Sequence, residues 1–322
     1  MNLDYAAMRD KWIKEKPLYE RFARYIEDSV SQHIRIKGFW ARTSYRAKDL
    51  DSFLKKIFRK RYDDPFRQMI DLAGVRITVK FLEHLYEVKT IVETHYEVLK
   101  YEDKSQSLDF NEFGYSGIHM EVQLRSTSLD MSTQDFAHMI CEIQIRTLSQ
   151  DVWAEIEHDF SYKPDFSVPL DIRRTLCRMS ALLEISDNEF SAVQQKMLTL
   201  PDASEYGILS ALEKPFFRFV GWQYDKELSL EIIRNLKSLY EDTSLIELSI
   251  ESFADKNSDK IEAIYQQYKS ESEHPLLLYQ PEIFLIFERL EAKEFQLIYI
   301  WQEYYPFEGL QDIAKVWGRP LE

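Results

Sequence analysis

The fold is decided by the stretch Ile140-Cys141-Glu142-Ile143-Gln144-Ile145-Arg146-Thr147. Its side chains alternate between apolar and polar, and this period of two predicts a half-buried β-strand. Cys141, Ile143 and Ile145 then point to one face of the strand, and Glu142, Gln144 and Arg146 point to the other. We interpret the polar face as half of the floor of an active site.

Two other segments, residues 74–81 and 118–125, repeat this alternation. Their apolar sets are Val75, Ile77, Val79 and Phe81 in the first and Ile118, Met120, Val122 and Leu124 in the second. The opposite faces carry Arg76, Thr78 and Lys80, and His119, Glu121, Gln123 and Arg125. Neighbouring strands of this kind share one apolar core and line one polar groove. A sheet whose polar face is only solvated shows the same alternation, so periodicity alone names no reaction.

Length, composition and charge limit the class of protein. With 322 residues, 45% of them hydrophobic, the chain is long enough for two domains with packed cores. The formal net charge of −14 argues against nonspecific adhesion to nucleic acid. The charge is uneven, however, and a basic island consists of Arg42, Arg46, Lys48, Lys55, Lys56, Arg59, Lys60 and Arg61. Such an island can mark where phosphates bind.

The sequence also indicates the compartment. We find neither a basic-then-apolar leader nor an apolar run near the ~18 residues that a membrane span needs. The two cysteines, Cys141 and Cys177, fall in a predicted buried strand and a predicted helix, which favours a reducing compartment over a disulfide framework. We therefore expect a cytoplasmic protein without membrane contact.

Around the strands, apolar spacing and turn residues predict further elements. Before residue 118 these are a helix at 4–32 interrupted near Pro17, an extended segment at 35–48, a short helix capped by Asp51 or Asp49, a helix near 83–95, a strand at 96–100 and a loop at 101–113. After the central strand we expect a helix at 148–162. Its inward residues are predicted to be Val152, Trp153, Ile156 and Phe160, with Asp151, Glu155 and His158 on the opposite side.

The rest of the chain has helical spacing throughout. The predicted helical segments are 170–197, interpreted as a helical pair, and 206–219, 226–240, 243–254, 258–271, 281–291, 293–304 and 308–316. We place a first domain at 1–199 and an all-α domain at 200–322. The second domain is expected to regulate the first or to bind a protein partner through the aromatic candidates Trp222, Tyr240, Tyr304 and Tyr305, and a purely stabilising role is equally compatible.

Five motifs occur in a fixed order along the first domain. They are Arg46-Ala47-Lys48 with Ser52 and Lys56; Asp71-Leu72-Ala73-Gly74-Val75-Arg76-Ile77; Gly114-Tyr115-Ser116-Gly117-Ile118-His119; Glu142-Ile143-Gln144-Ile145-Arg146-Thr147; and Trp153-Ala154-Glu155-Ile156-Glu157-His158 through Tyr162-Lys163. In this order they resemble the RelA/SpoT synthetase family, the enzymes that make the alarmones ppGpp and pppGpp. The resemblance covers roughly residues 40–163.

The resemblance implies an α+β fold with a nucleotidyltransferase-like mixed sheet flanked by helices, followed here by the all-α domain. It implies an enzyme that transfers pyrophosphate from ATP to the ribose 3′-hydroxyl of GDP or GTP and releases AMP. By motif position, Asp71 resembles the Mg²⁺ ligand, and Glu142 resembles the residue that shares the metal or takes the hydroxyl proton.

The same resemblance assigns the binding residues. Arg46 and Arg76 match the pair that sandwiches the adenine, and Lys48, Ser52 and Lys56 match the contacts to the ATP phosphates. Tyr115 matches the residue that stacks on the acceptor base, with His119, Gln144 and Arg146 near the acceptor phosphates.

The chemistry of pyrophosphate transfer suits these residue types. Attack on phosphorus requires in-line placement and neutralisation of phosphate charge by metal and cations. Mg²⁺ prefers carboxylate and phosphate oxygens, so an Asp and a Glu on adjacent strands fit. Flat guanidinium groups stack on a purine where ammonium groups cannot.

The acceptor is the open question, because the loop before Gly114 lacks the Lys-Asp-Tyr-Ile and Pro-Lys pieces usual in alarmone synthetases, and Ser116-Gly117 replaces Arg-Ser. Some small members of the family modify the 3′ end of tRNA as toxins. Tyr115 and His119 fit either acceptor, whereas the charge of −14 is unfavourable for a polyanion. We therefore expect GDP or GTP, with tRNA as the alternative and a catalytically silent nucleotide-sensing module as a second alternative. Homo-oligomerisation is left open.

Overall fold

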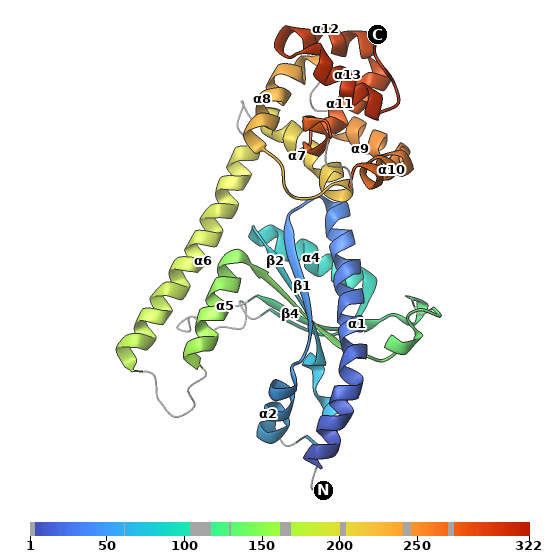
Figure 1. Cartoon of the computed structure of the whole chain (residues 1–322). Helices are drawn as coiled ribbons and strands as arrows, with labels where there is room; N and C mark the ends of the chain where they lie inside the picture. Colours follow the sequence, from blue (N-terminus) through green and yellow to red (C-terminus); the bar gives the residue numbers. More distant parts are fainter. Residues whose placement is uncertain are drawn as a thin grey trace. The chain divides into compact units, whose positions relative to one another are not determined.

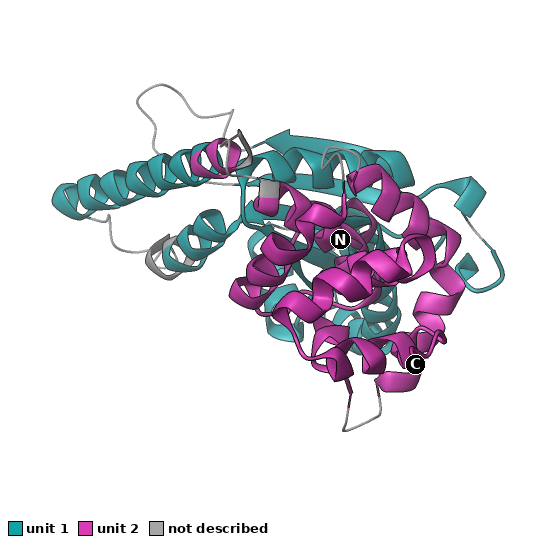
Figure 2. Ribbon diagram, turned by 90° about the horizontal axis from the view of Figure 1, so that it is seen from above, with its two compact units in different colours: residues 1–34, 41–192 teal, residues 35–40, 193–322 magenta. Residues whose placement is uncertain are grey.

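The computed structural model divides the chain into two compact units, which Figure 2 shows in different colours. Unit 1 comprises Met1–Ile34 and Ala41–Ala192, and unit 2 comprises Arg35–Trp40 and Val193–Glu322. The structure describes residues 4–60, 62–103, 117–128, 130–161, 169–199, 204–240, 246–269 and 274–322. The division falls after Ala192, inside a helix, and the domain boundary at residue 200 stays a prediction.

Unit 1 is built on a five-stranded mixed sheet (Figure 1). The strands are β1 (Ala41–Ala47), β2 (Ala73–Val79), β3 (Tyr96–Asp103), β4 (Ile118–Leu124) and β5 (Cys141–Thr147), in the order β1-β2-β5-β4-β3. The central pair, β2 and β5, is parallel, and every other neighbouring pair is antiparallel. The three predicted alternating strands are therefore adjacent, and the predicted α+β fold with a mixed sheet is confirmed.

The two faces of the sheet differ as the alternation predicts. Val75, Ile77, Ile143 and Ile145 are buried on the apolar face. Helices α1 (Tyr5–Lys37) and α4 (Leu82–His95) cover this face. The hydroxyl groups of Ser31 on α1 and Thr43 on β1 are 2.8 Å apart, and the rings of His33 on α1 and His95 on α4 are 3.6 Å apart between centroids. The polar face is thereby left to line a site.

Helix α1 runs without a break through Pro17, so the predicted interruption is wrong. A proline inside a helix leaves the carbonyl four residues earlier without its backbone donor. Pro17 and Ile13 are both exposed, and water can therefore satisfy the carbonyl of Ile13.

A small cluster beside the sheet positions the segment before β2. Helices α2 (Leu50–Lys60) and α3 (Pro65–Gln68) and the 3₁₀ turn η1 (Ile70–Leu72) make this cluster. Trp12 from α1 stacks on Phe53 from α2, with ring centroids 4.9 Å apart. Leu72 is buried in the same cluster, which fixes the neighbouring Asp71 at the start of β2.

Helix α5 (Leu148–Ser161) follows β5 directly, and α6 (Leu170–Thr199) is one continuous helix instead of the predicted pair. Thr147 and Ser149, at the junction of β5 and α5, both donate hydrogen bonds to Asp187 of α6. Trp153 is buried as predicted, but Val152 is 53% exposed. Helix α5 packs against the polar face of the sheet, so its inward side carries charged residues and Val152 turns to solvent. Phe160 and His158 lie outside the described side chains.

Unit 2 contains helices α7 (Ser204–Phe219), α8 (Lys226–Leu236), α9 (Ile246–Lys256), α10 (Ser258–Tyr268), α11 (Ile283–Ala292), α12 (Glu294–Tyr304) and α13 (Phe307–Val316). They match the predicted segments. Helix α11 is buried from Ile283 to Leu290 and lies in one large apolar cluster with the other helices. Its charged residues Glu288 and Arg289 pair with each other. Among the described residues, every helix is too short or too polar to span a lipid bilayer.

Candidate active site

The polar face of the sheet arranges its side chains in rows that cross β1, β2 and β5. Strand register aligns Arg46, Gly74 and Glu142 in the first row, Ser44, Arg76 and Gln144 in the second, and Arg42, Thr78 and Arg146 in the third. On β4, Glu121 lies opposite Glu142, and His119 lies opposite Gln144. The alternation of each strand therefore brings charged groups of both signs together.

A cavity of about 260 Å³ lies over the first two rows, lined by Ser44, Tyr45, Arg46, Gly74, Val75, Arg76, Glu142 and Gln144. Arg46 packs over Gly74, where an added Cβ would be in ordinary van der Waals contact with Cγ of Arg46 at 3.7 Å. Arg46 and Arg76 thus reach the same cavity from adjacent strands. A larger hollow of about 800 Å³ lies along α6 and Ile156, away from these rows.

Asp71 lies beside the cavity between two lysines. Nζ of Lys48 is 2.7 Å from Oδ2 of Asp71, and Nζ of Lys56 is 2.8 Å from Oδ1. The backbone of Asp71 (φ −94°, ψ 27°) departs from helical values in the region where many active-site residues lie. Burial raises the pKa of Asp71, but the two lysines outweigh it and hold the pKa below its ordinary value. Asp71 is therefore ionised at neutral pH.

Glu142 is held from β4 and from its own strand. Nδ1 of His119 is 3.3 Å from Oε1 of Glu142, and the amide of Gln144 donates to Oε2 at 3.0 Å. Burial raises the pKa of Glu142, His119 lowers it, the charge of Asp71 raises it, and the net pKa lies below the ordinary value. Two ionised carboxylates thus lie near enough to repel each other, an arrangement that a divalent cation relieves.

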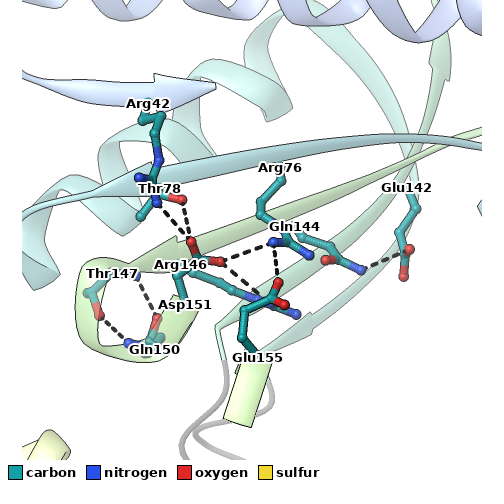
Figure 3. Close-up of polar contacts among 10 residues, drawn as sticks. All are labelled: Arg42, Arg76, Thr78, Glu142, Gln144, Arg146, Thr147, Gln150, Asp151 and Glu155. Carbon is teal, nitrogen blue, oxygen red and sulfur yellow. Dashed lines mark hydrogen bonds and ion pairs between the residues drawn. The ribbon is translucent and has the colours of Figure 1, made fainter. Parts of the chain in front are cut away.

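The third row is held by α5, which approaches the polar face (Figure 3). Oδ2 of Asp151 is 3.0 Å from Nη2 of Arg42, and Oδ1 is 3.5 Å from Nη1 of Arg76 and 3.7 Å from Nη1 of Arg146. One turn later, Glu155 lies 2.7 Å from Nη1 of Arg76. Helical spacing predicted these two acids on the side away from the core, and the structure turns that side onto the sheet.

The comparisons with known proteins cover this half of the chain. The family described as the region found in RelA / SpoT proteins matches residues 45–166. The GTP pyrophosphokinase YjbM of Bacillus subtilis is 30% identical over 150 residues, which are 46% of this chain and 69% of that relative. The chain belongs to the RelA/SpoT family. The predicted family membership is therefore confirmed.

Two further likenesses of this RelA/SpoT chain come from the same organism. The GTP pyrophosphokinase YwaC of Bacillus subtilis is 27% identical over 161 residues, 48% of this chain and 74% of that relative. The crystal structure of the small alarmone synthetase 1 from Bacillus subtilis matches with a TM-score of 0.50 and 25% identity, over 59% of this chain and all of that chain. The shared fold is that of unit 1.

The structure brings most of the predicted site residues of this RelA/SpoT chain together. Asp71 meets Lys48 and Lys56, and Glu142 meets His119 and Gln144. Ser52 lies in the first turn of α2, where its backbone N–H donates to Asp49 at 2.8 Å. Arg146 lies one row from Gln144 and faces Asp151.

Tyr115 of the predicted site lies outside the described residues, as does Lys163 at the end of the fifth motif. Among the residues that the structure does describe, no group of three or more His, Cys, Asp and Glu side chains could hold a metal ion by itself. A divalent cation at Asp71 and Glu142 would thus also need substrate oxygens, as Mg²⁺ sites in phosphoryl-transfer enzymes commonly do.

Proposed function

We propose that the protein is an ATP-dependent pyrophosphokinase that transfers the β,γ-pyrophosphate of ATP to the 3′-hydroxyl of GDP or GTP, which yields (p)ppGpp and AMP. The observation that carries the proposal is the cavity of about 260 Å³ that Arg46 and Arg76 line together with Glu142. Family membership and the relatives named GTP pyrophosphokinase support it. Two guanidinium groups at one cavity suit a stacked purine.

The residues divide the work of the reaction. Arg46 and Arg76 would hold the adenine, and Lys48 and Lys56 would turn from Asp71 to the phosphates of ATP. The acceptor hydroxyl oxygen forms a bond to the β-phosphorus while the bond from that phosphorus to the α,β-bridging oxygen breaks and AMP leaves. Glu142, ionised at neutral pH, takes the hydroxyl proton.

Asp71 and Glu142 fit a divalent cation, because the pKa values of both carboxylates lie below their ordinary values and the charge of Asp71 raises the pKa of Glu142. Mg²⁺ bound there would neutralise charge on the transferred phosphates. His119 and Gln144 keep the carboxylate of Glu142 oriented, and His119, Gln144 and Arg146 would contact the acceptor phosphates on the β4 and β5 side of the site.

One labelling experiment tests the proposal. Purified protein is supplied with γ-labelled ATP and Mg²⁺ and, in separate reactions, with GDP, GTP or deacylated tRNA. Label is expected on the guanine nucleotide, with AMP as the second product. Label on tRNA alone, lost when the terminal 3′-hydroxyl is removed, would overturn the acceptor, and nucleotide binding without AMP formation would favour a silent sensing module.

A matched pair of variants assigns the proton acceptor. Glu142→Gln removes the carboxylate proposed to act, whereas Glu121→Gln removes the one directly opposite it on β4, which lies 3.8 Å from Lys100. We expect Glu142→Gln to abolish transfer and Glu121→Gln to retain it. Full activity in Glu142→Gln would remove this residue from the mechanism.

We also propose that unit 2 regulates the enzyme or binds a protein partner. It has its own apolar core, and α12 exposes Phe295, Tyr299 and Tyr304. Of the aromatic candidates from the sequence, Tyr304 is exposed, whereas Trp222, Tyr240 and Tyr305 pack against that core. Deletion after Met197 should change the transfer rate several-fold; an unchanged rate in a folded remainder would contradict regulation.

A further inference from the structure

A single carboxylate on α5 contacts arginines from three adjacent strands. Asp151 reaches Arg42 on β1, Arg76 on β2 and Arg146 on β5, and it also accepts a hydrogen bond from Thr78 at 3.4 Å. Figure 3 shows its carboxylate at the centre of these side chains. No role proposed above uses this residue, although two of its partners belong to the site.

The balance of charge makes this carboxylate necessary. The side chains of Asp151 and Arg146 are each 11% exposed, so water screens their charges poorly. Burial lowers the pKa of Arg146, and the nearby charge of Arg76 lowers it further, while Asp151 opposes both. Without Asp151, the buried guanidinium group of Arg146 would lose this ion pair, whereas Arg76 would keep Glu155 and Arg42 would keep its contact with solvent. Removal of one partner from such a buried group leaves uncompensated charge and displaces the rest.

We infer that Asp151 is a positioning residue that holds the guanidinium groups of Arg76 and Arg146 and so links the ATP side of the site to the acceptor side. Arg76 lines the cavity proposed for the adenine, and Arg146 comes from the strand that carries Glu142. Displacement of these guanidinium groups would weaken their charge-assisted contacts with both substrates. The inference rests on the proposed function for the identity of those substrates.

Glu155 provides a matched control on the same helix. It lies one turn after Asp151 and contacts Arg76 at 2.7 Å, closer than Asp151 does. Its side chain is 66% exposed, however, and an exposed ion pair contributes little because water and salt screen it. Both acids can be changed to their amides with almost no change in volume, so burial is what separates the two variants.

The experiment compares steady-state kinetics of the full chain and its variants for ATP and GDP. Asp151→Asn should raise KM for both substrates at least tenfold with kcat within threefold, whereas Glu155→Gln should leave both KM values within threefold. Asp151→Glu, which restores the charge, should give intermediate values. Equal KM values in Asp151→Asn and Glu155→Gln, a KM change for only one substrate, or a loss confined to kcat would overturn the inference.

Two further measurements keep the test decisive. If circular dichroism shows that Asp151→Asn is unfolded, Asp151→Glu carries the test: a threefold or larger rise in both KM values supports the inference, and unchanged values overturn it. If wild-type protein transfers no label, the proposed function fails, and titration with a non-hydrolysable ATP analogue decides instead. Tenfold weaker binding by Asp151→Asn than by wild type supports positioning, and equal or absent binding in both overturns it.

Discussion

Unit 1 and unit 2 differ in what surrounds an acid that is shielded from water, which is partly buried before β2 in unit 1 and fully buried in the core of unit 2. Asp71 lies between Lys48 and Lys56, within 2.8 Å of both. Glu282, which precedes α11, is fully buried, and within the described part of the chain neither of its carboxylate oxygens has a hydrogen-bond partner. Burial costs both groups the same kind of hydration energy. Lys48 and Lys56 compensate the charge of Asp71, whereas no hydrogen-bond partner among the described residues compensates the carboxylate of Glu282.

The difference appears directly in protonation. The pKa of Asp71 stays below its ordinary value despite burial. Burial raises the pKa of Glu282 to about 7, with a smaller opposing effect of Ser229 and a reinforcing one of Asp225. A site that binds metal and phosphate requires ionised acids and cations, whereas an apolar helical core tolerates an acid chiefly in its neutral form. Replacing each acid by its amide should therefore have different consequences.

The largest effect is expected for Asp71→Asn. Loss of the carboxylate removes a proposed metal ligand and leaves Lys48 and Lys56 without their counter-charge. The transfer rate should fall by about 1000-fold or more. It is measured with labelled ATP and GDP beside Asp51→Asn, an exposed acid on α2 that should behave as wild type. Substantial activity in Asp71→Asn would show that the site in unit 1 does not require this ionised carboxylate.

Glu282→Gln is expected to stabilise the folded protein at neutral pH and above. A raised pKa in the folded state favours folding below the ordinary value of 4.5, and this contribution is lost as pH rises through about 7. The variant should match wild type near pH 4.5 and exceed its free energy of unfolding by about 3 kcal/mol above pH 7. Hydrogen exchange of α11 in urea measures it, with the exposed Glu303→Gln as control. An advantage independent of pH would show that protonation is not the cause.

The contrast between the units extends to two glycines. At Gly117, before β4, an added Cβ would stand 2.1 Å from the carbonyl oxygen of Ile145 and 2.8 Å from Cγ of Arg146. Because backbone cannot yield as a side-chain end can, Gly117→Ala should cost about 2 kcal/mol of stability in unit 1. Thermal unfolding measures the loss. A wild-type melting temperature would mean that the approach of β4 to β5 is looser than described.

The smallest effect is expected for Gly207→Ala, and it should be stabilising. Gly207 is an exposed position of α7, and an added Cβ would meet no atom within 4 Å. Alanine loses less backbone entropy than glycine when a helix forms, so unit 2 should gain about 0.5–1 kcal/mol. Chemical denaturation compares this variant with Gly117→Ala, and the two changes in the free energy of unfolding should have opposite signs. A loss of stability in Gly207→Ala would contradict the open space around this position of α7.

Sequence patterns were sufficient for the strands and for most helices. The alternation at Cys141–Thr147 and its two repeats predicted which side chains share the polar face, because a strand must alternate. The helices of unit 2 followed from apolar spacing alone. By motif position, the resemblance assigned Asp71 and Glu142 to the metal, Lys48 and Lys56 to the ATP phosphates, and His119 and Gln144 to the acceptor phosphates. These roles stay predictions, and the structure pairs Asp71 with Lys48 and Lys56, and Glu142 with His119 and Gln144. Periodicity is a local property, so it can be read without partners.

Only the tertiary structure decided which surface each helix or strand face packs against. The sequence could not show that α5 packs on a polar face, so it turned Asp151 outward and Val152 inward, and the structure reverses both. Nor could it show that α1 continues through Pro17, because that depends on the freed carbonyl reaching solvent. The burial of Glu282 without a partner and of Asp151 among three arginines likewise depends on segments far apart in sequence. Burial and charge pairing are set by distant neighbours, which a local pattern does not contain.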